Sequence, residues 1–182
     1  RKEGETALEW IGDFIAAEGI DCDFRRCGRF HAAHTPQHFE MLARDADRMP
    51  AQEGIEAHLV PRDRQRDELG TDAYFGGVVF PRHSALDPGR YHRGLLNAAI
   101  ASGAHVTGQC AVTAIDRQRD GFTLTTAKGP VRARDVIVAT NGYTTGLTPW
   151  LQRRVIPIGS YVIATEPLSD NLMTTLFPTD RI

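Results

Sequence analysis

Residues 135–146 join an apolar run to small and polar residues, an order that can place chemistry at the end of a strand. Val136-Ile137-Val138-Ala139 is followed at once by Thr140-Asn141-Gly142. Such a run is typical of a buried parallel strand. In open α/β sheets ligands lie beyond the carboxyl ends of the strands, and Gly142 lets the backbone approach a flat or anionic group. The alternative is a core strand followed by an ordinary turn.

Two further stretches carry residues that could line a pocket. Residues 74–81, Tyr-Phe-Gly-Gly-Val-Val-Phe-Pro, predict an apolar strand. Its paired glycines, Gly76 and Gly77, either admit a ligand plane or mark a β-bulge, and the bulge is favoured. Tyr161 lies in a predicted strand, where it either joins the core or offers its hydroxyl group to a pocket.

Several motifs that would define other chemistries are missing from the sequence. It has no GxGxxG and no GxxxxGK followed by Ser or Thr, so no phosphate-binding loop is predicted. It has no GxSxG, which disfavours a serine hydrolase. His31, His34 and His38 are spaced closely, but Thr35-Pro36 interrupts a common helix face and no Cys or Asp completes a ligand set. A solvated cluster is favoured over a metal site, and we expect no metal.

In the first half of the chain, helices and strands alternate. Apolar residues from Ala7 to Ile15 repeat at helical spacing, and Gly19 ends this helix. A second helix is predicted from the Thr35-Pro36 start to about Arg48. Strands are predicted over 22–30, 54–60 and 74–81, and the charged residues 62–69 predict a short solvated helix or loop.

After Ser84 the pattern changes. Asp87-Pro88 predicts the start of a helix that ends at Gly103, and small residues on one of its faces predict close packing against a sheet. Asp120-Gly121 and Lys128-Gly129 are turn signals between short strands. The predicted strands are residues 105–108, 111–116, 122–126, 131–134, 136–140 and 156–165.

The composition indicates a soluble globular protein: 182 residues, 41% hydrophobic and 24% charged. A net charge of -2 disfavours nucleic-acid binding, and no apolar run is long enough to span a membrane. Cys22, Cys27 and Cys110 favour reduced thiols and a cytoplasmic location, with Cys22 and Cys27 buried rather than paired. The chain begins at Arg1 without Met or a secretory leader, and we expect it to begin inside a longer protein.

The order of these pieces resembles the FAD-dependent amino acid and amine oxidoreductases of the D-amino acid oxidase (DAO) superfamily. The resemblance covers nearly the whole chain and rests on Ala85-Leu86-Asp87-Pro88 with its helix, Gly103-Ala104, and residues 112–115, 131–134 and 136–143. Residues 20–24, 74–77 and 154–168 look most like the gamma-glutamylputrescine oxidoreductase branch. Members of the superfamily open with a βαβ unit that carries the glycine fingerprint and close with a second flavin-contacting segment. This chain has neither, so it looks like a central fragment.

The resemblance implies a mixed α/β (α+β) fold. Part of an FAD-binding domain of the glutathione-reductase type would be joined to the sheet of a substrate domain. Residues 1–83 would belong to the substrate domain, residues 84–150 to the FAD-binding domain, and residues 151–182 would return to the substrate domain.

The resemblance also implies roles for individual residues. Val112 would present its backbone to the adenine of FAD, and Ala139, Thr140, Asn141 and Gly142 would pass near the pyrophosphate and ribityl chain. Substrate-side candidates beside the isoalloxazine are Tyr74, Gly76, Gly77 and Tyr161. Arg82, Arg153 and Arg154 are candidates for a substrate carboxylate by proximity alone, and no catalytic residue is assigned.

The implied reaction moves hydride from the carbon bearing an amine to the flavin, and water hydrolyses the resulting imine. The partners would be a small amine or amino acid and the remaining segments of the same flavoprotein. One alternative is an FAD-dependent oxidation of a 2-hydroxy acid or polyol. Another is that the 182-residue chain alone is a folded but inactive module.

Overall fold

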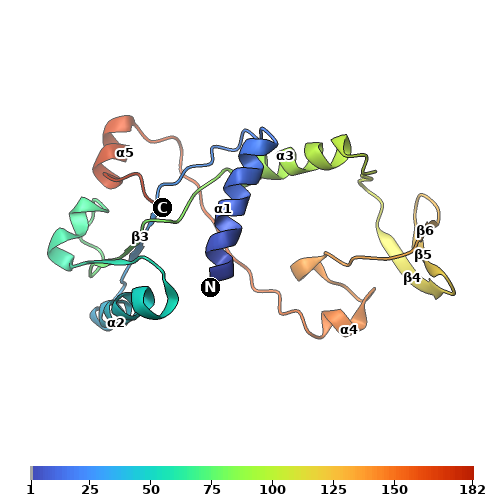
Figure 1. Ribbon diagram of the computed structural model, residues 1–182, viewed down its shortest axis with the longest axis horizontal. Helices are drawn as coiled ribbons and strands as arrows, with labels where there is room; N and C mark the ends of the chain where they lie inside the picture. The colour runs from blue at the N-terminus through green and yellow to red at the C-terminus, as the bar shows by residue number, and fades with distance from the viewer. Residues whose placement is uncertain (1) are drawn as a thin grey trace. The chain divides into compact units, whose positions relative to one another are not determined.

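The computed structural model describes residues 2–182, and within that range the side chains of residues 3, 4, 6–50 and 54–182. The chain divides into two compact units. Unit 1 consists of the residues up to Ala104 together with Thr165–Ile182, and unit 2 is His105–Ala164. Figure 1 shows the helices and strands of both units. The assignment of residues 1–83, 84–150 and 151–182 to substrate and FAD-binding domains stays a prediction.

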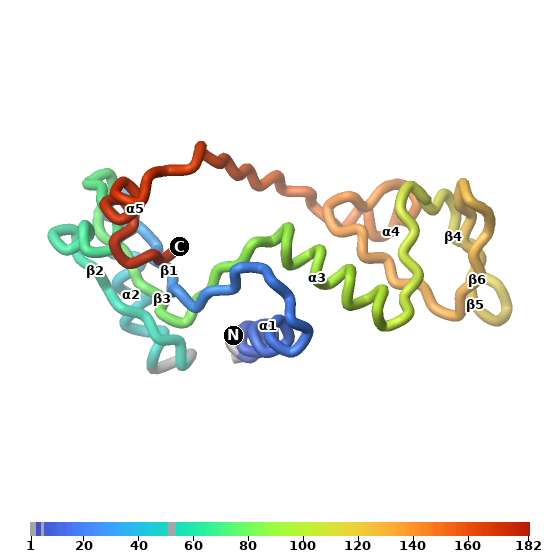
Figure 2. Tube along the Cα trace, turned by 90° about the horizontal axis from the view of Figure 1, so that it is seen from above, coloured from blue at the N-terminus to red at the C-terminus, as the bar shows by residue number. Residues whose placement is uncertain are grey.

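A three-stranded antiparallel sheet lies at the centre of unit 1. Its order is β1-β3-β2, with β1 (Arg29–Ala32), β2 (His58–Val60) and β3 (Gly77–Phe80). Val78 of β3 lies opposite His31 on one side and Leu59 on the other. The C-terminus runs beside β1 (Figure 2), where the Phe30 amide donates to the Ile182 carbonyl oxygen at 2.8 Å.

Helix α2 (Pro36–Glu53) covers one face of this sheet and packs on β2 and β3. It begins where the sequence predicts, because the Thr35 side chain accepts a hydrogen bond from the His38 amide and Pro36 needs no amide partner. The helix runs past Arg48 to Glu53 and ends at Gly54 in the left-handed conformation, φ 68°. The core between helix and sheet contains Ala33, Leu42, Ala46 and Val78.

Unit 1 has further helices, namely α1 (Lys2–Ala17), the 3-10 helix η1 (Arg62–Asp67), α3 (Pro88–Ala101) and α5 (Asp170–Leu176). Of these, α1 and α3 confirm predicted helices, whereas α5 was not predicted. Asp87 caps α3 by accepting from the Gly89 and Arg90 amides, and chiefly the Arg90 bond lowers the pKa of its carboxyl group. The small face of α3 is not packed against a sheet, however, and none of its residues is buried.

All three predicted strands of unit 1 are shorter than expected, and the one predicted over 74–81 is limited to β3. The strand predicted over 22–30 is limited to β1, because Asp23 (φ 51°) and Gly28 (φ 72°) turn the chain out of the extended conformation. Only an isolated bridge from Arg25 to Ala85 precedes β1. The strand predicted over 54–60 begins at His58, because Gly54 still belongs to the end of α2.

Unit 2 contains the predicted antiparallel meander, β4 (Val112–Gln118), β5 (Gly121–Thr126) and β6 (Val131–Ala133), in that order. Its turns use Gly121 at φ 142° and Gly129 at φ 112°, backbone conformations that residues with a side chain rarely adopt. The 3-10 helix η2 (Asn141–Tyr143) and α4 (Pro149–Gln152) follow the meander.

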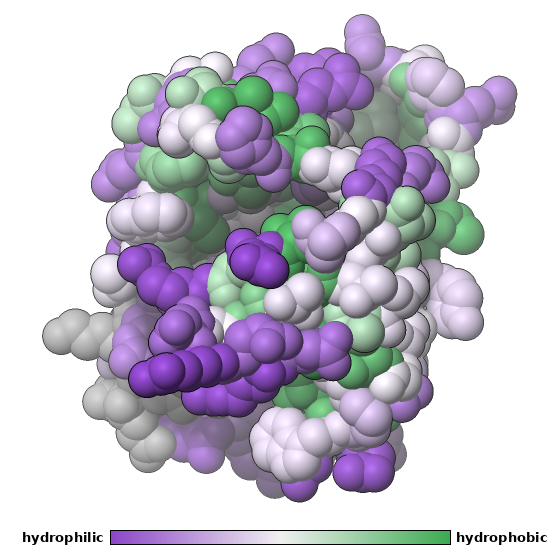
Figure 3. Space-filling view, turned by 90° about the vertical axis from the view of Figure 1, so that its right-hand side faces the viewer, coloured by the Kyte–Doolittle hydropathy of each residue, from purple (hydrophilic) through white to green (hydrophobic). Residues whose placement is uncertain are grey.

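The strands predicted over 105–108, 136–140 and 156–165 are absent from unit 2. A strand exists through its hydrogen-bonded neighbours, and these segments pair with no other strand in the described structure. Their apolar residues are therefore exposed: Ile137 by 90% and Ile158 by 86%. On the face drawn in Figure 3, hydrophobic side chains (green) reach the surface between hydrophilic ones.

All three cysteines are free. Cys22 is buried as predicted, and burial raises the pKa of its thiol, whereas Cys27 is only half-buried. Among residues 2–182, no helix has the length and apolar character needed to cross a membrane. The cytoplasmic location stays a prediction.

Candidate functional site

The predicted cofactor turn, residues 139–142, lies where the extended run of unit 2 bends into η2. Asn141 adopts a positive φ of 46°. The Thr144 hydroxyl group closes the turn by donating to the Asn141 carbonyl oxygen at 2.7 Å, and it lies 2.8 Å from the Thr140 hydroxyl group. The turn therefore has a defined shape without any strand partner.

The backbone of this turn is open to a ligand. Residues 139–142 are all exposed, and a Cβ added at Gly142 would meet only the Pro157 Cβ, at 3.8 Å. In an exposed turn of small residues with open space beside its glycine, the backbone can contact a phosphate-bearing cofactor. Val112 lies elsewhere in unit 2, at the start of β4, where it pairs with Thr126.

The paired glycines of β3 have a different explanation, and neither marks a bulge. The register from Gly77 to Phe80 is continuous against β1. A Cβ at Gly76 would lie 2.5 Å from the Val60 carbonyl oxygen, and one at Gly77 would collide with the His31 carbonyl oxygen. Both glycines are buried, so close approach of neighbouring backbones requires them. The favoured prediction of a bulge is wrong.

Tyr74 lies at a hollow of about 350 Å³ beside β1, here called the β1 hollow. Its ring centroid lies 5.5 Å from that of His34, which in turn stacks on His38 at 5.6 Å. The polar residues that line the β1 hollow are Arg29, His31, His34, Glu68, Tyr74 and Arg181. The strand register of β1 and the loop before β3 thus bring histidines and a tyrosine together.

The charges around the β1 hollow are unequal. Arg181 and Thr179 both donate to Oε2 of Glu68, the Thr179 bond at 3.0 Å. Burial lowers the pKa of His31, and the nearby positive charge of Arg29 lowers it further. His31 is therefore neutral near pH 7 and adds no positive charge to the hollow.

Gln65 holds the loop that carries Tyr74, and no sequence pattern predicted this role. Although it lies among charged residues, its side chain is only 1% exposed. Its carbonyl oxygen accepts from the Gly76 amide at 2.9 Å, and its amide group donates to the Thr71 carbonyl oxygen. Gln65 thus holds residues 71–76 at both ends of the loop. Residues 62–69 were predicted to be solvated, and at Gln65 that prediction is wrong.

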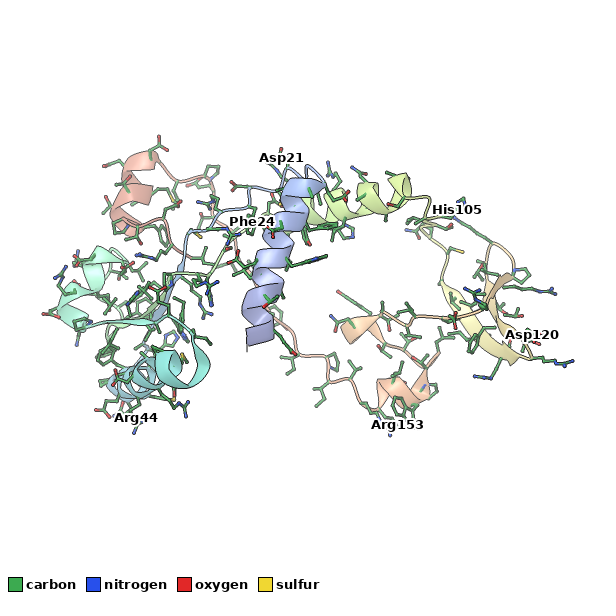
Figure 4. The ribbon with its side chains drawn as sticks, in the orientation of Figure 1. Asp21, Phe24, Arg44, His105, Asp120 and Arg153 are labelled. Carbon is green, nitrogen blue, oxygen red and sulfur yellow. The ribbon has the colours of Figure 1, made fainter. Side chains whose placement is uncertain are left out.

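Tyr161 and the three arginine candidates each have their own surroundings. Tyr161 is 94% exposed, so it is neither in a core nor in a pocket of the described structure, and its ring lies over Gly159. Arg82 of unit 1 points to Glu9 at 3.4 Å. In unit 2, Arg154 stacks over the Trp150 ring at 3.9 Å, next to Arg153 at the end of α4 (Figure 4).

The histidines at the β1 hollow do not form a metal centre. Within the part of the chain that the structure describes, no group of three His, Cys, Asp or Glu side chains is placed to hold a metal ion. The His38 Nδ1 atom instead accepts from the His34 amide at 3.2 Å. The His38 ring contacts the rings of both His31 and His34, and His34 is the exposed member.

Comparison with known proteins gives one family match, described as FAD dependent oxidoreductase (DAO), over residues 2–181. The gamma-glutamylputrescine oxidoreductase of Escherichia coli is 32% identical over 171 residues, 93% of this chain and 40% of that protein. A probable oxidoreductase, OrdL, of Haemophilus influenzae is 26% identical over 89% of this chain and 38% of its own length.

Among solved structures, the glycine oxidase of Geobacillus kaustophilus matches with a TM-score of 0.72 at 18% identity, over 82% of this chain and 41% of that one. The glycine oxidase of Bacillus cereus matches with a TM-score of 0.70 at 17% identity, over 84% of this chain and 43% of that one. These likenesses show the mixed α/β fold of DAO-type flavoproteins. The chain spans about two fifths of the length of these relatives.

Proposed function

Because the chain belongs to the FAD dependent oxidoreductase (DAO) family, we propose that the protein containing it oxidises the C–N bond of an amine or amino acid. The observation that carries this proposal is the match over residues 2–181, nearly the whole chain. FAD is the cofactor of the family. The 32% identity to gamma-glutamylputrescine oxidoreductase supports a substrate of that kind, an amine that carries a gamma-glutamyl group.

We assign the cofactor contacts to unit 2. The open turn at residues 139–142 would approach the pyrophosphate and ribityl chain through its backbone, and Val112 would approach the adenine. When bound, FAD supplies the electron acceptor for the oxidation. The protein itself would bind the cofactor and the substrate, orient them and exclude water. Tyr74 and Tyr161 stay candidates for the substrate side, and the structure gives Tyr74 the better-defined surroundings.

The test uses the longest native chain that contains this segment, loaded with FAD. Under anaerobic conditions the flavin absorbance is recorded with gamma-glutamylputrescine, sarcosine, glycine, D-alanine and 2-hydroxyglutarate in separate cuvettes. We expect an amine to bleach the flavin. The rates of bleaching then rank the amines as substrates. Bleaching by 2-hydroxyglutarate alone would contradict the proposal and favour oxidation of a hydroxy acid. A protein without flavin would contradict both.

The 182-residue chain by itself is the subject of a separate test. If it is an inactive module, a flavin titration followed by fluorescence quenching finds no saturable binding up to about 100 µM, because exposed turns bind weakly without a surrounding pocket. Micromolar binding would contradict this expectation. It would also mean that this chain holds most of the determinants for the cofactor.

A further inference from the structure

We propose that the β1 hollow is an anion-binding site for a carboxylate group, with Arg29 as its main ligand. This site is independent of the oxidation proposed above, because it rests only on the charges and contacts of unit 1. Nothing in the family match assigns a ligand to these residues.

The first argument is the balance of charge. Arg29 and Arg181 are the cations that line the hollow, and Glu68 is its acid. Glu68 already accepts from Arg181 and Thr179 through one oxygen atom, and its side chain is only 13% exposed. Arg29 has no hydrogen bond or ion pair to any residue that the structure describes, although it is half-buried. A half-buried guanidinium without a counter-ion is stabilised by an anion.

The second argument is the set of other hydrogen-bond donors around Arg29. His31 follows two residues later on β1, so both side chains leave the same face of the sheet. The His34 ring and the Tyr74 hydroxyl group, which line the same hollow, can add hydrogen bonds to an oxyanion. The hollow therefore combines the unpaired guanidinium group of Arg29 with several further hydrogen-bond donors.

Size and protonation select a carboxylate. A volume of about 350 Å³ suits a small ligand, and Phe30 and Leu69 in the lining suit a short apolar stem. A planar guanidinium matches the two oxygens of a carboxylate. A phosphate dianion needs more positive charge, and burial together with Arg29 disfavours protonation of His31. A single negative charge is therefore the better fit.

The experiment is NMR of the longest native chain that contains this segment, with 13C-labelled histidine rings. Acetate is titrated at constant ionic strength, with chloride and inorganic phosphate as separate arms. We expect saturable shifts of the His31 and His34 rings with acetate and none with chloride. Arg29→Gln should weaken acetate binding at least about tenfold, because it removes the charged partner.

Arg44→Gln is the matched control, since it removes one positive charge from an exposed position on α2 (Figure 4) and should leave binding unchanged. Arg29→Lys keeps the charge without the planar fork and should bind with intermediate affinity. It also serves as the test if Arg29→Gln does not fold. Shifts that do not saturate, equal binding by all three variants, or tighter binding of phosphate than of acetate would overturn the proposal.

A competition arm identifies the source of the carboxylate. If gamma-glutamylputrescine displaces acetate from the site, the carboxylate belongs to that compound. If acetate binds and is not displaced, the site takes a free carboxylate. Both results require the saturable acetate binding that the proposal predicts, and the flavin assay above is decided separately.

Discussion

Unit 1 and unit 2 each contain a three-stranded antiparallel sheet, but their interiors differ. Every buried hydrophobic side chain of the described structure lies in unit 1, among them Leu42 and Val78. Unit 2 has no buried residue, and Ile137, Tyr161 and Val162 are at least nine-tenths exposed. Strand pairing alone therefore does not produce a core. In unit 1 the core arises because α2 covers one face of the sheet.

The difference separates two kinds of apolar run in the sequence. An apolar run in unit 1, such as residues 77–80, is explained by packing inside the chain. A similar run in unit 2, residues 136–139, belongs to neither sheet of the described structure and leads into an open turn. Stability and binding should therefore respond to substitutions in different units.

The largest effect is expected from a cavity in the core of unit 1. Leu42→Ala should lower the free energy of unfolding by about 2–5 kcal/mol, because it removes buried methyl groups. Ile137→Ala should change it by less than about 0.5 kcal/mol, since Ile137 is exposed. Urea unfolding followed by fluorescence measures both, with Trp10 in unit 1 and Trp150 in unit 2 as reporters. Similar losses in both variants would contradict the comparison.

The glycines give a second contrast. Gly77→Ala should cost about 1–3 kcal/mol, because its new methyl group collides with the His31 carbonyl oxygen and the backbone must move. Gly142→Ala has open space and should leave stability unchanged. If the turn at residues 139–142 contacts FAD, Gly142→Ala should still weaken flavin binding in the longest native chain. Unchanged flavin affinity would count against that assignment.

Gln65→Leu tests the clamp on the loop before β3. It should cost about 1–3 kcal/mol, because the buried Gly76 amide and Thr71 carbonyl group lose their partner. Gln118→Leu is the control, since Gln118 is exposed at the end of β4 in unit 2. Hydrogen exchange at the Gly76 amide should speed up in the first variant alone. A stable Gln65→Leu protein would show that the clamp is dispensable.

A smaller loss is expected at the start of α2. Thr35→Ala should cost about 1 kcal/mol, because the His38 amide loses the hydroxyl group that caps it. Thr35→Ser keeps the hydroxyl group and should retain most of the stability. The urea midpoint reported by Trp10 measures both variants.

The smallest effect concerns pH. Burial lowers the pKa of His31 and His83 in the folded chain, and the charge of Arg29 adds to this in both. Their unfolded pKa is about 6.5, so the unfolded state takes up protons first as the pH falls. This contribution to stability is present above about pH 6.5 and is lost as the pH falls through the folded pKa. The urea midpoint of unit 1 should drop between about pH 7.5 and 5.5, and less so in His83→Asn.

Local signals predicted the parts of the fold that depend on neighbouring residues. Thr35-Pro36 and Asp87-Pro88 start their helices, and Asp120-Gly121 makes its turn, because caps and tight turns need only a few adjacent residues. Residues 136–140 failed as a strand for the opposite reason. A strand needs partners that can lie anywhere in a protein, and its own sequence does not say whether they are present.

The candidate site was predictable only in part. The open turn at Asn141-Gly142 follows from the residue types, whereas Gly76 and Gly77 were read correctly as unusual but for the wrong reason. Gln65 and the β1 hollow were missed, because the hollow depends on residues far apart in the sequence, such as Arg29 and Arg181. Such long-range meetings leave no periodic pattern.

The registers of the two sheets also bear on the order of folding. In unit 2 the paired residues of β4 and β5 are close in the chain, from Gln118 with Gly121 to Val112 with Thr126. In unit 1, Arg29 pairs with Phe80, across more than a quarter of the sequence. Short loops close sooner than long ones, so the meander should form early and the sheet of unit 1 late. The sheet that forms first is then the one without a buried core, so its apolar side chains stay exposed to aggregation for longest during folding.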